Sequence, residues 1–224
     1  GSLPQKYLLV DTGLRPREVE KLVRVGDLIS FATEARELSG ETISGHTLDN
    51  RASVAATTVA LDLLSRRKPQ WDVIAVATAQ EEVGGIGAMG AAFDLMPDFA
   101  IVIDVTFASS PGSSGAGTFE MGKAVPLTWG ACDHPALYKA LESCAKEYEI
   151  AVIRDFAPRG SGTDAWDVQV AQAGIPVIEL GIPLRYMHTP VEVVSIKDIK
   201  RAGRLMAEFI NDLPADFMKN IIWE

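Results

Sequence analysis

The alternation of short apolar stretches with stretches of helical spacing restricts the possible folds of this chain more than any other feature of the sequence. The pattern holds from about residue 50 to residue 212 and predicts an α/β fold. The expected strands of this region are 72–79, 99–105, 151–156 and 176–181. The expected helices are 50–67, 87–95, 134–149, 163–174 and 196–212.

Two of the expected strands, "VIAVATA" and "AIVIDV", are apolar at nearly every position instead of alternating between apolar and polar residues. Strands of this kind are covered on both faces, as in a sheet between two layers of helices. We therefore expect a three-layer α/β/α domain with a mostly parallel central sheet, in which these two strands are central.

The first part of the chain has a different character from the rest. Residues 6–11 and 27–32 read as strands, and residues 15–23 between them read as a short helix. The sequence thus predicts a small β-rich unit over residues 1–42, followed by the α/β domain over residues 43–224.

Charge and cysteine content exclude several classes of function. The formal net charge is −9, the pI is near 4.9, and the largest basic cluster is "SRRK", which argues against binding to nucleic acid or to an anionic membrane. Cys132 and Cys144 form neither a disulfide framework nor a paired-cysteine metal site. With no signal-peptide pattern and no apolar run of membrane-spanning length, we expect a cytoplasmic protein that acts on a peptide or another small substrate.

A glycine pattern after the first expected central strand suggests one possible function. Gly85, Gly87 and Gly90 fit the dinucleotide-binding spacing, and Asp104 lies 19 residues beyond Gly85. However, Glu81 and Glu82 precede the glycines and would repel the phosphates of a nucleotide. A nucleotide-binding protein therefore remains a less favoured alternative to a tight turn between strand and helix.

The adjacent acids Glu81 and Glu82 stand where an apolar strand is expected to end. Neighbouring residues of an extended segment point to opposite sides, so the pair cannot easily act as matched acids on one atom. The two can divide roles in a metallohydrolase, in which one carboxylate binds the metal and the other takes a proton from water. A solvated strand end is the simpler alternative.

Three further polar residues also stand at or near the ends of expected strands: Asp49, Asp104 and His188. Each has an ordinary explanation when taken alone, as a helix cap, a turn residue or a loop histidine. The ends of neighbouring parallel strands form one crevice, so the three side chains can converge there with the glutamates. Carboxylates with one imidazole suit Zn²⁺, Co²⁺ or Mn²⁺.

These residues lie in motifs that resemble the dinuclear-metal aminopeptidases, the family that includes the tetrahedral and glutamyl aminopeptidases. The resemblance covers nearly the whole chain, and its first part is similar to the end of the small β-domain that those enzymes insert into the catalytic domain. The motifs are "TLDNRAS", "TAQEEVGGIGA", "VIDVT", "GSGTDAW" and "RYMHTPVEVVS", with "LLVDTG" and "VRVGD" nearer the start.

The resemblance implies a role for each candidate residue. Asp49 would bridge two divalent metal ions, zinc or cobalt, while Glu82 and His188 complete one site. Asp104 would belong to the other site, and Glu81 would be the general base. The implied activity is hydrolysis of the N-terminal residue from short peptides.

Two more residues are implicated less directly. Asp164, in "GSGTDAW", would contact the free amino terminus of the substrate or shape its pocket, unless it caps its own helix. Arg185 would brace the loop that carries His188, or contact the substrate.

One implied metal ligand has no match in this sequence. The similar enzymes carry a further histidine before the inserted β-domain, at a place that precedes the first residue here. His46 and His134 are poor substitutes, because His46 should face away from Asp49 and His134 sits in a helix start that Asp133 caps.

We therefore expect one complete metal site, one incomplete site, and an uncovered sheet edge that favours a homo-oligomer. The alternative to a peptidase is a non-catalytic scaffold or peptide-binding subunit.

Overall fold

The computed structural model describes residues 4–221, and the chain divides into two compact units, Gly1–Ala32 and Thr33–Glu224. The first unit contains a 3₁₀ turn, η1 (Gln5–Tyr7), and the helix α1 (Pro16–Leu22), which confirms the helix predicted here. The strands expected at residues 6–11 and 27–32 do not form among its described residues. A strand needs a neighbour to complete its hydrogen-bond ladder, and no segment between residues 4 and 221 pairs with either of these.

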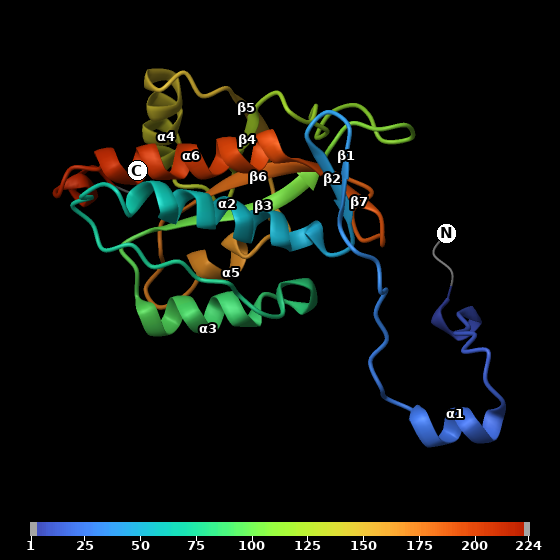
Figure 1. The fold of residues 1–224 in the computed structure, drawn as a ribbon. Coiled ribbons are helices and arrows are strands. Elements are labelled where there is room, and N and C mark those ends of the chain that lie inside the picture. The colour runs from blue at the N-terminus through green and yellow to red at the C-terminus, as the bar shows by residue number, and fades with distance from the viewer. Residues whose placement is uncertain (1–3, 222–224) are drawn as a thin grey trace. The chain divides into compact units, whose positions relative to one another are not determined.

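The second unit holds all the described strands and most of the helices (Figure 1). Its strands are β1 (Arg36–Leu38), β2 (Thr42–Gly45), β3 (Ala100–Phe107), β4 (Val125–Gly130), β5 (Val152–Ala157), β6 (Val177–Arg185) and β7 (Glu192–Ser195). Its helices are α2 (Leu48–Leu64), α3 (Ile86–Leu95), α4 (Pro135–Glu147), α5 (Ala165–Gln169) and α6 (Ile196–Asp212), with 3₁₀ turns η2 (Glu81–Val83) and η3 (Phe217–Asn220). The predicted boundary after residue 42 stays a prediction.

The sheet is mixed and largely antiparallel, so the prediction of a mostly parallel sheet was wrong. Its order is β1-β2-β7-β6-β4-β5, with β3 paired to β6. Only the β3–β6 and β4–β5 pairs of the described strands are parallel. The short connections from β1 to β2 and from β6 to β7 leave no room for a crossover helix, so these strands pair as antiparallel neighbours.

Helices cover both faces of this sheet, as expected for an α/β fold. The helices α2, α4 and α6 pack on one face around the larger apolar core, and α3 and α5 cover the other face with a smaller core (Figure 1). At the contact of α2 with α6, a Cβ on Gly203 would lie 2.5 Å from the carbonyl oxygen of Ala56. The glycine therefore lets the two helices approach closely. None of the helices in the described part of the chain is long and apolar enough to cross a membrane.

Neither of the two strands expected to be central occupies a central position. Residues 72–79 are exposed and form no strand, although their sequence is apolar. β3 forms, but among the described strands it pairs with β6 alone and is an edge strand. The apolar pattern predicted coverage on both faces, but it does not report whether a neighbouring strand is present.

Candidate metal centre

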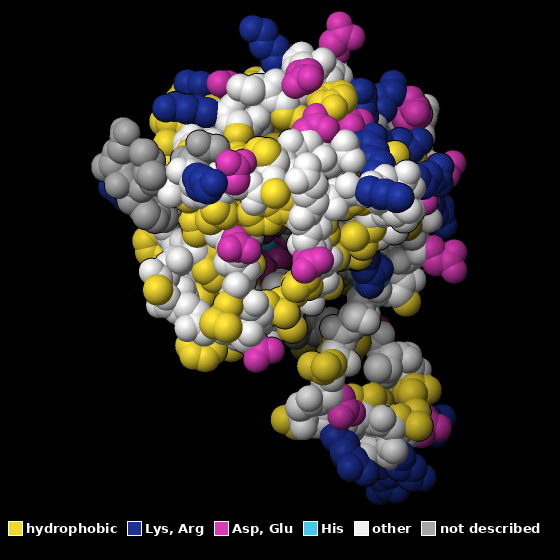
Figure 2. Space-filling view, turned by 90° about the vertical axis from the view of Figure 1, so that its left-hand side faces the viewer, with side chains coloured by type: hydrophobic (Ala, Val, Ile, Leu, Met, Phe, Trp, Pro, Cys, Tyr) yellow, Lys and Arg dark blue, Asp and Glu magenta, His cyan; other side chains and the backbone are white. Residues whose placement is uncertain are grey.

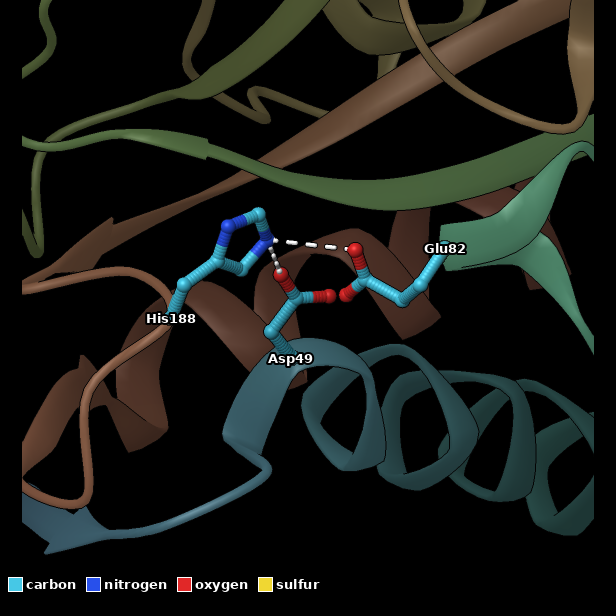
Figure 3. A group of neighbouring side chains, drawn as sticks. All are labelled: Asp49, Glu82 and His188. Atoms are coloured by element: carbon cyan, nitrogen blue, oxygen red, sulfur yellow. Dashed lines mark ion pairs between the residues drawn. The ribbon is translucent and has the colours of Figure 1, made fainter. Parts of the chain in front are cut away.

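Three side chains from distant parts of the sequence converge at one point on the second unit. Nε2 of His188 lies 3.1 Å from Oδ2 of Asp49 and 3.3 Å from Oε2 of Glu82 (Figure 3). One ligand atom from each of the three side chains lies within 4.8 Å of the others. Figure 3 shows all three side chains pointing toward a common space from separate elements. An imidazole and two carboxylates at this spacing are suitable ligands for a divalent cation.

The backbone around Asp49 turns its carboxylate toward this space. Asp49 and Asn50 stand at the start of α2 but have non-helical backbone angles, so the first turn is kinked. The Asp49 side chain is only 11% exposed, whereas that of His188 is 62% exposed. Burial, followed by the nearby charge of Glu82, raises the pKa of the Asp49 carboxyl.

A fourth residue, Glu192, fixes the backbone of this centre, and the sequence analysis missed it. Its carboxylate accepts hydrogen bonds from the backbone N–H of Asp49, at 3.1 Å, and from that of His188, at 2.8 Å. Glu192 is 2% exposed. The sequence carried no signal for this role, because the two partners of Glu192 are backbone N–H groups that only the fold brings to it.

Glu81 and Glu82 lie on the 3₁₀ turn η2 and not on an extended segment, so the alternation expected for a strand does not apply to them. The turn brings Glu82 to His188 and leaves Glu81 half-buried beside the centre. Burial raises the pKa of the Glu81 carboxyl, and the charges of Glu82 and Asp164 raise it further. A carboxylate with a raised pKa next to a metal site is suited to accepting a proton.

Asp104 lies near this group but outside it. Its carboxylate accepts hydrogen bonds from the side-chain amide of Asn50 and from the backbone N–H of Val105. Burial raises its pKa to about 8, and the charges of Asp49 and Glu81 contribute in the same direction. Asp104 therefore faces the acidic group without joining the three converging ligands.

The structure also shows the hydrogen bonds of Asp164 and Arg185, the two residues with a less direct link to substrate binding. Oδ2 of Asp164 accepts a hydrogen bond of 2.6 Å from Oγ1 of Thr78, and its side chain does not cap α5. Its charge acts on both Glu81 and Asp104, so it belongs to the same acidic surface. Nε of Arg185 donates a hydrogen bond of 2.8 Å to the carbonyl of Ser109, and so holds the loop after β3.

Comparison with known proteins identifies the family of this chain. The sequence model of the M42 glutamyl aminopeptidases matches residues 2–205. The chain belongs to the M42 glutamyl aminopeptidase family. The family assignment drawn from the sequence motifs is therefore confirmed, and with it membership of a metallo-aminopeptidase family.

Similar proteins of known sequence or structure are longer than this M42 chain. The lysyl aminopeptidase of Pyrococcus furiosus is 33% identical over 220 residues, which cover 97% of this chain and 63% of that protein. The structure of aminopeptidase APDkam598 from the archaeon Desulfurococcus kamchatkensis has a TM-score of 0.81 and 33% identity, covering 92% of this chain and 59% of that one. The dodecamer PhTET1-12s has a TM-score of 0.68 and 26% identity, covering 82% and 55%. The chain thus spans about three fifths of the length of its relatives.

In this M42 chain the glycines of the nucleotide-like pattern have a packing role. A Cβ on Gly85 would lie 1.7 Å from Oδ2 of Asp167, and one on Gly87 would lie 2.1 Å from the carbonyl oxygen of Ala79. Gly85 also has a positive φ of 62° at the start of α3. These glycines allow the chain to turn back directly after the glutamates, whereas a Cβ on Gly90 would meet open space.

The remaining histidines of this M42 chain lie outside the converging group. His134 is buried, and its Nδ1 accepts a hydrogen bond of 3.2 Å from the backbone N–H of Ala136, so that His134 itself caps α4. The expectation that Asp133 is the cap was wrong, because Oδ1 of Asp133 accepts from the backbone N–H of Glu179. His46 follows β2 and is not one of the three converging ligands.

Proposed function

We propose that this chain carries the site of a metal-dependent aminopeptidase that hydrolyses the N-terminal residue from short peptides. The observation that carries the proposal is the convergence of Asp49, Glu82 and His188, with Glu81 beside them. Membership of the M42 family supports the same reaction.

The three converging side chains fit a divalent cation, and Zn²⁺ or Co²⁺ suits one imidazole with two carboxylates. They would hold one ion per chain, which would act as a Lewis acid on the scissile carbonyl and on water. Glu192 would keep Asp49 and His188 in position through their backbone N–H groups. Asp104 would be a ligand of a second metal site that Asp49 shares.

Glu81 is the general base of the proposed reaction. It would accept a proton from the attacking water and return it to the amine that leaves. Asp164, held by Thr78, would place a negative charge near the bound amino terminus of the substrate. The acidic surface as a whole favours a positively charged amino terminus over the peptide's carboxyl end.

A second candidate function is supported by the hydrogen bonds of Asp104. Because its carboxylate is engaged by Asn50 and Val105, a chain with one bound ion could bind peptides without turning them over. Such a protein would serve as a peptide-binding subunit or scaffold.

Metal content and turnover measured on the same protein test the proposal. The protein is dialysed against Co²⁺ or Zn²⁺, the metal per chain is measured by mass spectrometry, and release of p-nitroaniline is followed on a panel of amino-acid p-nitroanilides. One ion per chain with metal-dependent release supports the peptidase. A tightly held ion without release supports the second candidate, and absence of both overturns the metal centre.

We also propose that the chain forms a homo-oligomer. Exposed apolar side chains are numerous on both described units, and the similar PhTET1-12s is a dodecamer. Light scattering coupled to size-exclusion chromatography measures the mass directly. A mass of a single chain at micromolar concentration would contradict the proposal.

A further inference from the structure

Asp164 stands at the end of a loop that its own backbone does little to hold. The loop, residues 159–164, connects β5 to α5, forms no regular element and contains two glycines. In the described part of the chain, none of its backbone N–H groups donates to a backbone carbonyl. Glycines also widen the range of conformations that such a loop can adopt. Contacts of side chains must therefore set the position of Asp164.

The hydroxyl of Thr163 joins this loop to the sheet. Its Oγ1 donates a hydrogen bond of 2.9 Å to Oε2 of Glu179 on β6 and accepts one of 3.2 Å from the backbone N–H of Ala165. Oγ of Ser161 lies 3.1 Å from the same hydroxyl. Because β6 is buried along nearly its whole length, Glu179 is a firm support. These bonds fix the chain on both sides of Asp164.

A second buried carboxyl, that of Asp133, holds Glu179. Oδ1 of Asp133 accepts a hydrogen bond of 2.9 Å from the backbone N–H of Glu179. Asp133 is 7% exposed and Glu179 is 3% exposed. Burial raises the pKa of Asp133 to about 8, and the charge of Glu179 contributes in the same direction. Asp133 therefore keeps its proton at neutral pH, and Glu179 remains the hydrogen-bond acceptor for the loop.

The carboxylate of Asp164 has one oxygen that the protein does not use. Oδ2 accepts the bond of 2.6 Å from Thr78, whereas Oδ1 is buried without a hydrogen-bond partner among the described residues. Asp164 lines the same cavity as Glu81 and Asp104, and Figure 2 shows a hollow in the surface with acidic side chains in its depth. A buried acceptor without a partner is costly, so Oδ1 is suited to a donor that arrives with a ligand. The charged amino terminus of a peptide is such a donor.

We propose that Glu179 is a positioning residue, which holds Thr163 and thereby aims Oδ1 of Asp164 at the amino group of the substrate. The inference rests on the proposed peptidase function, and within it on the contact between Asp164 and the substrate's amino terminus. Glu179 is buried, so it acts on the substrate only through the loop. Preference for an unblocked amino terminus would then depend on a carboxylate that touches no substrate.

Binding of a small amine tests the inference without turnover. The first probe is L-leucinol, which has a free amino group and no bond that a peptidase can cleave. The second is isohexanol, which has the same carbon skeleton without the amino group. Calorimetry on protein dialysed against Zn²⁺ gives the ratio of the two dissociation constants, here called the amine preference. We expect the parent protein to bind leucinol at least about tenfold more tightly than isohexanol.

Variants of Thr163 and Glu179 test whether the loop must be held. Thr163→Val keeps the shape of the side chain without its donor and should lower the amine preference by about tenfold, as expected for one hydrogen bond to a charged group. Thr163→Ser keeps the hydroxyl and should retain the preference. Glu179→Leu should behave like Thr163→Val. Glu179→Gln should retain the preference, because its amide oxygen can still accept from Thr163.

The matched control is Thr42→Val on β2, which also removes a threonine hydroxyl that donates to a backbone carbonyl, that of Ser39. It should leave the amine preference unchanged. Thermal unfolding is recorded for every variant, because a purely structural role would lower the melting temperature of Thr163→Val and leave its amine preference intact. If Thr163→Val does not fold, Ser161→Ala at a partly exposed position replaces it, with a smaller loss expected.

Asp164→Asn separates failure of this inference from failure of the proposed function. We expect it to lose the amine preference. If it keeps the preference, the contact of Asp164 with the amino terminus is refuted and the inference with it, while the metal centre is unaffected. If Asp164→Asn loses the preference but Thr163→Val and Glu179→Leu keep it, the inference alone is overturned. Equal binding of the two probes to the parent protein would overturn both.

Discussion

Oε1 of Glu192 accepts a hydrogen bond of 2.8 Å from the backbone N–H of His188, whose φ of 61° places it in the left-handed region. The other oxygen accepts from Asp49, so one buried carboxylate positions two proposed ligands. Glu192→Gln loses one acceptor and turns a donor toward a backbone N–H. We expect affinity for Co²⁺ to fall by roughly 10- to 100-fold, as for other residues that orient metal ligands.

Titration calorimetry with Co²⁺ measures this effect. Glu208→Gln serves as the control, because Glu208 is also a buried, paired glutamate but lies on α6 away from the centre. Equal losses of affinity in the two variants would mean that the effect is one of general stability and not of ligand position.

Glu81→Gln and Glu82→Gln separate the proposed base from the proposed ligand. Glu81→Gln should retain metal and lose turnover by about 10²- to 10⁴-fold, the usual contribution of a general base. Glu82→Gln should weaken metal binding itself, because Glu82 is one of the three converging groups. Metal content and p-nitroanilide hydrolysis are measured on both, with the exposed Glu147→Gln on α4 as the charge-matched control. Identical behaviour of the two variants would refute the division of roles.

Substitution of Gly87 and of Gly90, both on α3, by alanine should change the stability of the protein in opposite directions. Gly87→Ala places a methyl group 2.1 Å from the carbonyl oxygen of Ala79, and this clash with backbone should cost about 1–3 kcal/mol and disturb the adjacent η2 turn. Gly90→Ala meets open space and should stabilise the helix by about 0.5–1 kcal/mol. Urea unfolding monitored by circular dichroism distinguishes the two, and a stabilised Gly87→Ala would show that the turn has room to adapt.

The ion pair of Arg67 with Glu208 predicts a pH dependence of stability. The hydrogen bond from Arg67 lowers the pKa of Glu208 in the folded protein below its ordinary value of 4.5. In acid the unfolded chain therefore binds more protons than the folded chain. The pair therefore stabilises the fold above about pH 4.5 and loses this contribution as the pH falls through the folded pKa. Glu208→Gln should cost about 1.5–3 kcal/mol at neutral pH.

The comparison of unfolding free energies across pH tests this sign. The difference between the parent protein and Glu208→Gln should shrink as the pH falls through the folded pKa of Glu208, because a protonated Glu208 is as uncharged as the glutamine that replaces it. Glu147→Gln, at an exposed position, should show little difference at any pH. A difference that grew in acid would contradict the proposed pairing.

The sequence correctly predicted those helices and strands whose caps and apolar periodicity lie within one short segment of the chain. Helix α6 was expected at residues 196–212 and forms there, because Ser195 caps it through the N–H of Lys197 and its apolar residues recur at helical spacing. Helix α4 was also predicted from apolar residues at helical spacing, and strand β6 was predicted from a short apolar run. The four-residue strand β7 was missed, since its "EVVS" is too short for periodicity to be read.

The parts that were predicted wrongly depend on neighbours in space. Residues 72–79 have the composition of a buried strand, but a strand forms only where a second one lies beside it. Likewise, the buried role of Glu192 could not be read from the sequence. Its two partners are backbone N–H groups of residues that come together only when the chain folds. The metal-ligand candidates Asp49, Glu82 and His188 were identified from motif order, and the structure brings those three together while leaving Asp104 apart.

The bond from the backbone of Asp49 to Glu192 joins positions that are 143 residues apart. During synthesis the ribosome therefore delivers Asp49 and Glu82 long before His188 and its supporting glutamate have been made. A nascent chain cannot complete the three-residue cluster until β7 has emerged from the ribosome. Binding of the proposed metal ion would therefore require that the β6–β7 hairpin has closed onto the start of α2.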